Sequence, residues 1–234
     1  MSVEGRRIAV VTGGTGGLGL AVSEAMVDAG YRTVVTWVVD GEAERARSVL
    51  GDRIELRRLD VTDPAEAGAL AAEFDHGSGC WALVHLVGGY LGDRPLGQMT
   101  PDEWQRQLDL NATSAAVMMG AFLPGMVRRG GGRVVAISSR AAVAPFAGAS
   151  AYAAGKAALI ALVHAASQEV KNDGVTVNCI LPSVIDTPGN RAAQPDADTE
   201  RWVAPADLAA VIAFLCSDAA RAVTGAAIPV YGRA

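Results

Sequence analysis

Tyr152 and Lys156 are the two side chains of this sequence whose types and spacing best suit proton transfer. They stand four apart in an alanine-rich segment that predicts a helix, so their Cβ atoms lie roughly 5–6 Å apart on one face. A free tyrosine has a pKa of about 10, too high for ready proton exchange at neutral pH. An ammonium group about 5 Å away, at an effective dielectric of about 20, favours the phenolate by roughly 3 kcal/mol, or about two pKa units. The pair therefore predicts an acid–base tyrosine; the alternative is a chance pairing on an ordinary helix.

A glycine-rich turn is the second feature with chemical meaning. It joins an apolar run, 8–11, that predicts a buried strand to a segment, 18–29, that predicts a helix. Glycines in such a turn let backbone N–H groups approach a pyrophosphate at the positive end of the helix. No Gly-Lys-Ser/Thr follows, so the turn favours a dinucleotide site over a nucleoside-triphosphate site. Two spacings fit: G-x-G-x-x-G on Gly14, Gly16 and Gly19, and T-G-x-x-x-G-x-G on Thr12, Gly13, Gly17 and Gly19.

The elements that must position these residues alternate along the whole chain. The predicted strands are 8–11, 33–39, 53–59, 81–87, 133–138, 175–181 and 226–231. The predicted helices are 18–29, 42–50, 64–74, 100–127, 150–171 and 205–217. Strict alternation implies right-handed crossovers and a parallel sheet with helices on both faces. The sequence therefore predicts an α/β fold: a single doubly wound Rossmann domain over residues 1–234 with a seven-stranded parallel sheet.

Two segments add detail to this pattern. Thr100-Pro101-Asp102-Glu103 combines an N-cap, a proline at the first helical position and a capping-box glutamate, and it opens the long helix. Residues 183–204 are irregular and rich in Pro, Asp, Asn and Ala. A connection of roughly 20 residues is long for an α/β domain, and such loops often cover a site. We expect this segment to be a substrate lid.

The composition limits the partners of the chain. Its 234 residues are 50% hydrophobic and 19% charged, below the usual ~25%, which suggests that other subunits cover part of the exterior. A net charge of −5 without a basic block argues against a nucleic acid partner. The apolar stretch 147–163 contains Tyr152 and Lys156 and is alanine-rich, so it predicts a buried helix rather than a membrane span.

The cysteines and histidines have no spacing typical of a metal site. Cysteines in an odd number predict buried thiols in a reducing cytoplasm, and residues 4–7 show no signal peptide. His85 lies in an apolar strand and is expected to pack there, whereas His76 lies in a Gly/Ser turn and is expected to be solvated. The three cysteines are Cys80, Cys179 and Cys216.

The second glycine spacing, with Tyr152-x-x-x-Lys156 and a serine thirteen residues before the tyrosine, Ser139, resembles the short-chain dehydrogenase/reductase family. The resemblance extends over nearly the whole chain and is closest to the 3-oxoacyl-carrier-protein reductases and related ketoreductases. It implies an NAD(P)-dependent oxidoreductase that interconverts a small-molecule ketone and a secondary alcohol by hydride transfer. Further matching motifs, in chain order, are Asp60-Val61, Asn111, Pro182-x-x-x-x-Thr187 and Thr224-Gly225.

The same resemblance implies a role for each catalytic residue. Tyr152 would protonate the carbonyl oxygen or deprotonate the alcohol, and Ser139 would hydrogen-bond that oxygen. Lys156 would lower the tyrosine pKa and hold the nicotinamide ribose, while Asn111 would position a water that passes protons through Lys156. The alternatives are a turn residue for Ser139, a helix-to-strand hydrogen bond for Asn111 and a plain loop residue for Thr187. The implied cofactor-binding residues are Gly13, Thr15, Gly16, Gly17, Leu18, Gly19, Trp37, Asp60, Val61, Leu86, Gly88, Asn111, Tyr152, Lys156, Ile185 and Thr187.

The choice between NAD and NADP depends on the end of the second strand. Trp37 stands where an NAD enzyme carries an acid for the adenosine ribose. Gly16 and Val38 stand where NADP enzymes often carry a base, and Asp40 could reach the ribose if the strand runs on. Because no cation is evident near the position of the 2′-phosphate, the sequence slightly favours NAD.

The sequence departs from the family pattern at several positions. Leu86-Val87-Gly88 replaces Asn-Ala-Gly, and with Gly89-Tyr90 it locally resembles the dihydropteridine reductase branch. Ser183 replaces a glycine after Pro182, and Tyr231 replaces an aspartate at a tetramer contact. These departures keep open a second interpretation, a non-catalytic dinucleotide-binding sensor or scaffold.

A row of small residues on the helix 150–171 bears on assembly. Family members pair this helix and the helix 100–127 across a two-fold axis, so we expect a homotetramer or homodimer. The alternative is a helix that packs only against its own sheet. The small residues are Ala153, Ala154, Ala157, Ala158, Ala161 and Ala165.

Overall fold

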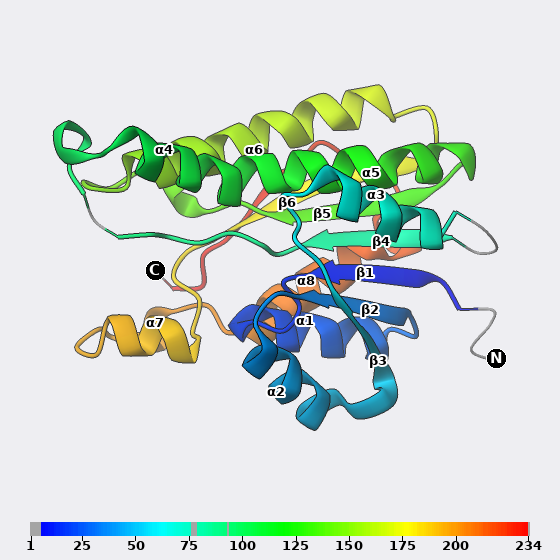
Figure 1. Cartoon of the computed structure of the whole chain (residues 1–234), viewed down its shortest axis with the longest axis horizontal. Coiled ribbons are helices and arrows are strands. Elements are labelled where there is room, and N and C mark those ends of the chain that lie inside the picture. The colour runs from blue at the N-terminus through cyan, green and yellow to red at the C-terminus, as the bar shows by residue number, and fades with distance from the viewer. Residues whose placement is uncertain (1–5, 76–78, 93, 234) are drawn as a thin grey trace.

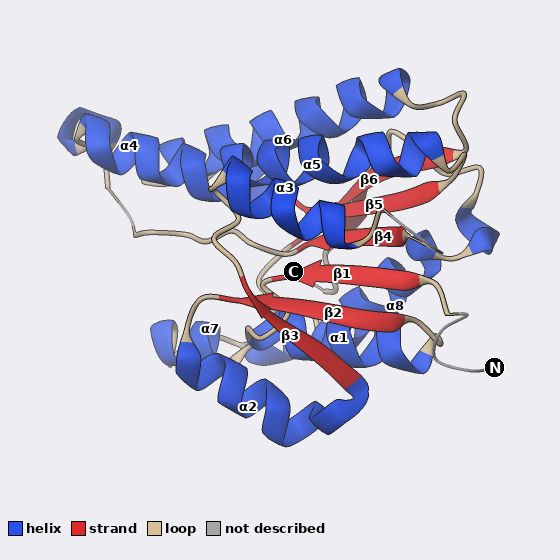
Figure 2. Ribbon diagram, turned by 45° about the vertical axis from the view of Figure 1, so that its right-hand side comes forward, coloured by secondary structure: helices blue, strands red, loops and turns tan. Residues whose placement is uncertain are grey.

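The protein folds around a single seven-stranded parallel sheet with helices on both faces (Figures 1 and 2). The structure is a computed structural model that describes residues 6–75, 79–92 and 94–233; His76 lies outside these ranges. The strand order is β3-β2-β1-β4-β5-β6-β7, as expected for a doubly wound fold. The strands are β1 Ile8–Thr12, β2 Arg32–Trp37, β3 Ile54–Arg58, β4 Cys80–His85, β5 Gly132–Ile137, β6 Val175–Pro182 and β7 Ala227–Val230.

The central strands are buried because helices cover both of their faces. Every residue of β1, β5 and β6 is buried, whereas the edge strand β3 is only partly so. Continuous apolar runs are typical of such strands, since neither face meets water. The three cysteines are free and buried in this core, which confirms that expectation.

Two layers of helices enclose the sheet. Helices α3, α5 and α6 cover one face, while α1 and α8 cover the other, with α2 beside β2 and β3 (Figure 2). The helices are α1 Gly17–Asp28, α2 Asp40–Leu50, α3 Pro64–Glu73, α4 Pro101–Leu108, α5 Ser114–Arg128, α6 Ser150–Glu169, α7 Pro188–Ala193 and α8 Pro205–Cys216.

The long helix expected over 100–127 is interrupted. Its start is as predicted, because the Thr100 hydroxyl accepts from the Glu103 N–H and the Glu103 carboxylate accepts from the Thr100 N–H. A π turn at Asp109–Thr113 then separates α4 from α5. Such turns insert a residue into the helical repeat and are frequent at functional sites. Here the turn contains Asn111.

The segment 183–204 is less irregular than expected, because it contains the short helix α7. Thr187 caps this helix by accepting a hydrogen bond from the Asn190 N–H at 3.2 Å. In Figure 1, α7 lies across from α4, at the end of the molecule where the strands finish. It is therefore placed to border whatever lies at those strand ends.

One helical stretch of the described chain, Pro101–Arg128, is long and apolar enough to cross a membrane by length and composition alone. In its most apolar window, 44% of the residues are buried inside the fold. Helices in the core of globular proteins meet the same criterion.

Candidate active site

Ser139 and Tyr152 meet just beyond the carboxyl end of β5. The backbone leaves the sheet after Ile137, and Ser139 caps a short 3₁₀ turn, Arg140–Ala142, by accepting from the Ala141 N–H at 3.1 Å. The Ser138 hydroxyl donates to the Lys156 carbonyl at 2.8 Å, which fixes α6 against this strand end. The Ser139 hydroxyl is thereby brought into hydrogen-bond contact with the Tyr152 hydroxyl.

The pKa of Tyr152 is raised rather than lowered in this structure. Burial of the phenol is the largest cause and raises the pKa, and the hydrogen bond with Ser139 partly offsets it. The Lys156 Nζ lies 6.0 Å from the centre of the tyrosine ring. The expectation that Lys156 lowers the pKa of this phenol is therefore corrected: desolvation has the largest effect and raises the pKa.

Lys156 is buried, with 3% of its surface exposed. Its ammonium donates to the Ile137 carbonyl at 2.7 Å. Burial lowers the lysine pKa to about 8, because the charged form loses its hydration. A Cβ on Gly88 would collide with the Lys156 Nζ and lie 2.9 Å from the Asn111 Oδ1. Gly88 thus lets the segment after β4 approach α6 closely.

Asn111 holds the segment after β4 in place. Its Oδ1 accepts from the Gly89 N–H at 3.0 Å, and its Nδ2 donates to the Gly89 carbonyl at 2.9 Å. Nδ2 also donates to the Gln107 carbonyl at 3.0 Å. The helix-to-strand connection proposed as the alternative for Asn111 is therefore present, and it places the amide beside Gly88 and Lys156.

The glycine turn forms a cradle of backbone N–H groups. Gly13 has a φ of +66°, and a Cβ on Gly19 would collide with the Gly13 carbonyl, so both positions require glycine. The N-terminus of α1 has no side-chain cap, and its first turn contains no acidic residue. Its first N–H groups, from Gly17 onward, therefore remain available to an anion.

The segment 183–204 and the end of β4 both approach this cradle. The Thr187 side chain lies 2.9 Å from the position that a Cβ on Gly17 would take. Ile185 bridges to Val203, and the Leu86 N–H donates to the Thr12 carbonyl at 3.1 Å. The glycine turn, the start of the segment 183–204 and the end of β4 thus meet in one place.

The residues expected at the adenosine end are more scattered. Trp37 ends β2 beside Arg58 of β3, and Val61 is buried. The Asp60 carboxylate accepts from the Thr62 N–H at 2.9 Å and from the Thr62 hydroxyl, which lowers its pKa. This side chain supports its own turn.

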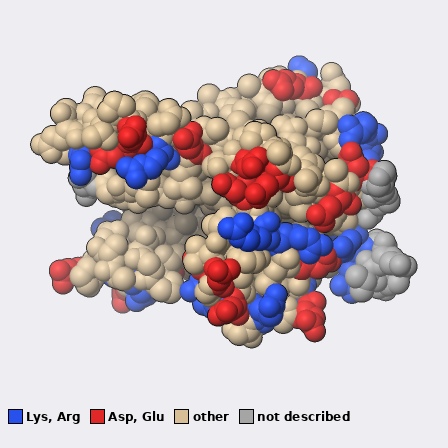
Figure 3. Space-filling view, viewed as in Figure 1, with Lys and Arg blue, Asp and Glu red and all other residues tan. Residues whose placement is uncertain are grey.

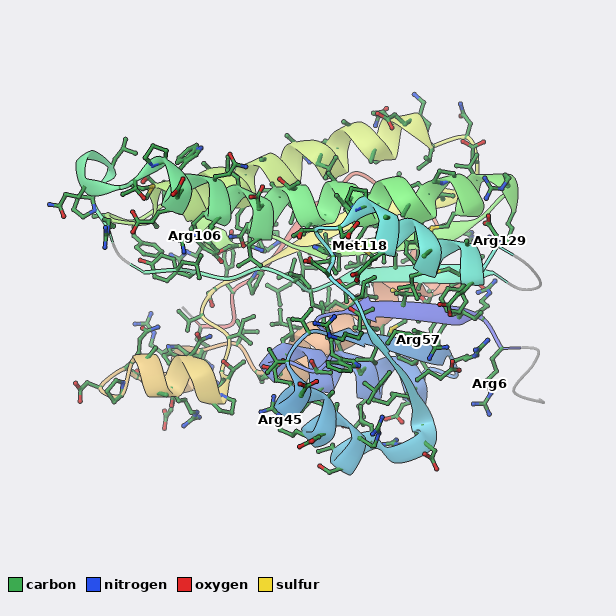
Figure 4. All side chains as sticks on the ribbon, in the orientation of Figure 1. Arg6, Arg45, Arg57, Arg106, Met118 and Arg129 are labelled. Carbon is green, nitrogen blue, oxygen red and sulfur yellow. The ribbon has the colours of Figure 1, made fainter. Side chains whose placement is uncertain are left out.

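Glu42 and Arg45 contact the glycine turn, and the sequence analysis did not identify either. The buried Thr15 hydroxyl donates to the Glu42 carboxylate at 3.1 Å, and the Arg45 guanidinium donates to the Thr15 carbonyl at 3.0 Å (Figure 4). A cation therefore lies beside the turn, contrary to the premise of the NAD preference. A continuous helix from Asp40 brings the two side chains there.

His85 is a packed residue, as expected. One ring nitrogen is hydrogen-bonded to Thr12 Oγ1 at 2.9 Å and the other to Ser114 Oγ at 3.1 Å. Burial lowers the pKa of this histidine to about 3, so it stays neutral at physiological pH. Within the described ranges, no three His, Cys, Asp or Glu side chains gather as metal ligands.

Comparison with known proteins places this arrangement in a family. The family model described as short chain dehydrogenase matches residues 7–198. The chain belongs to the short-chain dehydrogenase/reductase family. It is thus an NAD(P)-dependent oxidoreductase, and the fold and resemblance expected from the sequence are confirmed.

Individual relatives cover nearly the whole chain. A 3-oxoacyl-[acyl-carrier-protein] reductase of Vibrio cholerae is 32% identical, covering 99% of this chain and 98% of its own length. A dehydrogenase/reductase SDR family member 4 of Oryctolagus cuniculus is 29% identical over 97% of this chain and 93% of its own. An oxidoreductase of this family from Burkholderia thailandensis superposes with a TM-score of 0.88 at 30% identity, covering 97% and 92% of the two chains.

Proposed function

We propose that this short-chain dehydrogenase/reductase interconverts a small-molecule ketone and a secondary alcohol, with Tyr152 as the general acid and base. The observation that carries the proposal is the contact between the Ser139 and Tyr152 hydroxyls beside the buried Lys156. A carbonyl oxygen at that contact would accept two hydrogen bonds, and both would strengthen as negative charge develops on the oxygen.

The residues present fit a nicotinamide dinucleotide. The uncapped start of α1 and the glycines of the turn suit its pyrophosphate. Thr187, which contacts the turn at Gly17, and Lys156, which lies beside Tyr152, would hold the nicotinamide end. When bound, this group supplies or accepts the hydride.

In this proposal, side chains of the protein carry the proton to and from the substrate oxygen. Tyr152 gives its proton to the carbonyl oxygen in the reductive direction and takes it from the alcohol in the other, while Ser139 holds that oxygen. Lys156 lies next to Asn111 across Gly88. It returns a proton to the tyrosine after each reduction. Asn111 fixes the backbone of Gly89 and so keeps this path in register.

The adenosine end supports either coenzyme. Glu42 would accept from a ribose hydroxyl of NAD, and Arg45 would bind the 2′-phosphate of NADP, since both side chains already contact Thr15. The sequence's slight preference for NAD stays a prediction, weakened by the presence of Arg45.

The rival function is a dinucleotide-binding sensor or scaffold without turnover. Leu86 favours it, because its side chain provides no polar contact where the family carries asparagine. The intact hydroxyl pair favours the enzyme. We further propose a homotetramer in the cytoplasm, supported by the exposed alanines of α6 and the three buried free thiols.

The test is the Tyr152→Phe variant, assayed for carbonyl reduction with NADH and NADPH. We expect kcat to fall by roughly 10²–10⁴-fold, since that is the usual contribution of a positioned acid, with binding of both reduced coenzymes retained by fluorescence titration. Tyr31→Phe is the control, because it removes a phenol that donates to the Cys216 carbonyl on the other side of the sheet. Unchanged activity in Tyr152→Phe contradicts the mechanism, and wild-type binding without turnover of a carbonyl panel supports the sensor.

A further inference from the structure

A cavity of about 270 Å³ opens beside Tyr152. Its walls come from the segment after β4, from α4 and from the start of α6. That volume is at the small end for ligand pockets, so it suits a molecule of few carbons. Figure 3 shows a hollow between the regions of α4 and α7, and the cavity belongs to the α4 side, because its described lining includes residues of α4 and none of α7. The residues that line the cavity include Tyr90, Met99, Glu103, Arg106, Gln107 and Tyr152.

One side of the cavity is aromatic and holds the catalytic ring. Tyr90 packs edge-on against Tyr152, with ring centres 5.4 Å apart, and against Phe146 at 5.7 Å. Such edge contacts fix ring orientation. Since Tyr152 is itself part of the wall, a small molecule in the cavity has its carbonyl within reach of the catalytic tyrosine.

The opposite side carries charge, and most of it is neutralised. Arg94 pairs with the Glu103 carboxylate at 3.0 Å. The second oxygen of Glu103 accepts from the Thr100 N–H at 2.8 Å and from its hydroxyl at 3.0 Å. Both oxygens of Glu103 are therefore engaged in hydrogen bonds or the ion pair.

Arg106 adds a second guanidinium to this side of the cavity, and its charge helps to lower the pKa of Glu103. Its Nε donates to the Asp102 backbone carbonyl at 3.3 Å, and within the described ranges no carboxylate lies at ion-pair distance from its guanidinium. Figure 4 shows Arg106 on the side of α4 that faces the segment after β4. Among the described residues that line the cavity, two arginines, Arg94 and Arg106, therefore meet one carboxylate, Glu103, which leaves an excess of positive charge among these described residues.

We propose that the substrates of this site are short oxo-carboxylates, whose carboxylate pairs with Arg106 while the carbonyl lies at Tyr152. This inference rests on the proposed function and specifies its substrate class. A guanidinium presents two parallel N–H groups that match a carboxylate, and such a pair gives both strength and orientation. The carboxylate is unchanged in the reaction: hydride adds to the carbonyl carbon and the proton from Tyr152 adds to its oxygen.

The experiment compares each acid with its uncharged ester. Acetoacetate and 4-oxopentanoate are assayed against their ethyl esters in the wild type, Arg106→Gln and Arg106→Lys. We expect the wild type to prefer at least one acid over its ester. Arg106→Gln should lower kcat/KM for that acid by about 10–100-fold through KM, the usual loss for a charged hydrogen bond, and spare the ester. Arg106→Lys should restore part of the loss.

Controls keep this test separate from that of the proposed function. Arg128→Gln removes an exposed arginine that pairs with Asp75 at 2.7 Å, away from the cavity, and should change neither substrate. Ligand-observed NMR of acetoacetate binding without turnover gives a second measurement, with binding expected to weaken in Arg106→Gln. An acid-to-ester ratio that falls by less than threefold overturns the inference while the ester activity still supports the proposed function. If neither compound is reduced, NMR binding that is equal in wild type and Arg106→Gln overturns it.

Discussion

At the scale of single residues, Lys156 holds a charge where burial opposes it. Its ammonium donates to the Ile137 carbonyl, and the lysine pKa is lowered to about 8. The unfolded chain, with a lysine pKa of about 10.4, binds a proton that the folded chain releases earlier. The free energy of unfolding therefore increases with pH between these two pKa values. Below pH 8 this added stability is absent.

Lys156→Met should abolish this gain, because methionine fills a similar volume without a charge. Urea unfolding of both proteins at pH 7.5 and 9.5 measures the difference, and comparison within each pH cancels the other titrating groups. We expect the free energy of unfolding of the wild type, relative to that of the variant, to increase as pH rises. An equal difference at both pH values would show that folding does not lower the pKa of Lys156.

Gly88→Ala tests how closely the segment after β4 must approach α6. The new methyl would collide with the end of Lys156 and crowd Asn111. Overpacking costs about 1–3 kcal/mol, and because the flexible lysine end yields first, we expect activity to fall at least about tenfold with a smaller effect on stability. Gly68→Ala, on an open helical position, is the control and should stabilise slightly. Full activity in Gly88→Ala would contradict this prediction, because it would show that the added methyl group does not displace the end of Lys156.

Glu42 and Arg45 are expected to set coenzyme choice. Arg45→Gln should weaken NADPH binding by about tenfold, as for a lost charged hydrogen bond, and leave NADH nearly unaffected. Glu42→Gln should favour NADPH, since it removes a carboxylate close to the 2′ position. Fluorescence titration with both coenzymes measures the ratio, and Arg47→Gln on the same helix is the matched control. A ratio that stays constant in both variants would place the adenosine elsewhere.

At the scale of elements, alternation predicted every strand and the main helices within about two residues. Buried strands and capped helices carry strong local signals, such as the capping box at Thr100. The π turn at Asp109–Thr113 was not predictable, because one inserted residue leaves the apolar pattern of a long helix almost unchanged. The same limit hid Glu42 and Arg45: their role depends on where α2 begins, and helix ends are the least certain part of a sequence pattern.

The candidate site divides along the same line. Residues joined by fixed spacing, Tyr152 and Lys156, were identified, and Ser139 followed from the family pattern. Residues brought in from separate elements, such as Tyr90 and Arg106, were not. The predicted direction of the tyrosine pKa shift was wrong. The spacing of the pair says nothing about burial, and here desolvation is the larger effect.

At the scale of the whole molecule, the charge is low for a chain that stands alone. The α6 face with Ala157, Ala158, Ala161 and Ala165 is exposed, and small side chains let a second helix approach closely. We expect sedimentation to give four times the chain mass of 24.0 kDa. Ala161→Glu should shift the protein to smaller species, whereas Ala219→Glu, an exposed position outside α6, should not. A wild-type species of 24.0 kDa would refute the assembly.

The contact of Thr187 with Gly17 has a consequence for engineering. It places the start of the segment 183–204 directly against the glycine turn, and α7 begins immediately after Thr187. A chimera that exchanges only the chain beyond Thr187 is therefore expected to keep its coenzyme binding and to acquire different residues at the substrate entrance. A chimera whose exchange begins a few residues before Thr187 is expected to lose coenzyme binding and to disturb the substrate entrance.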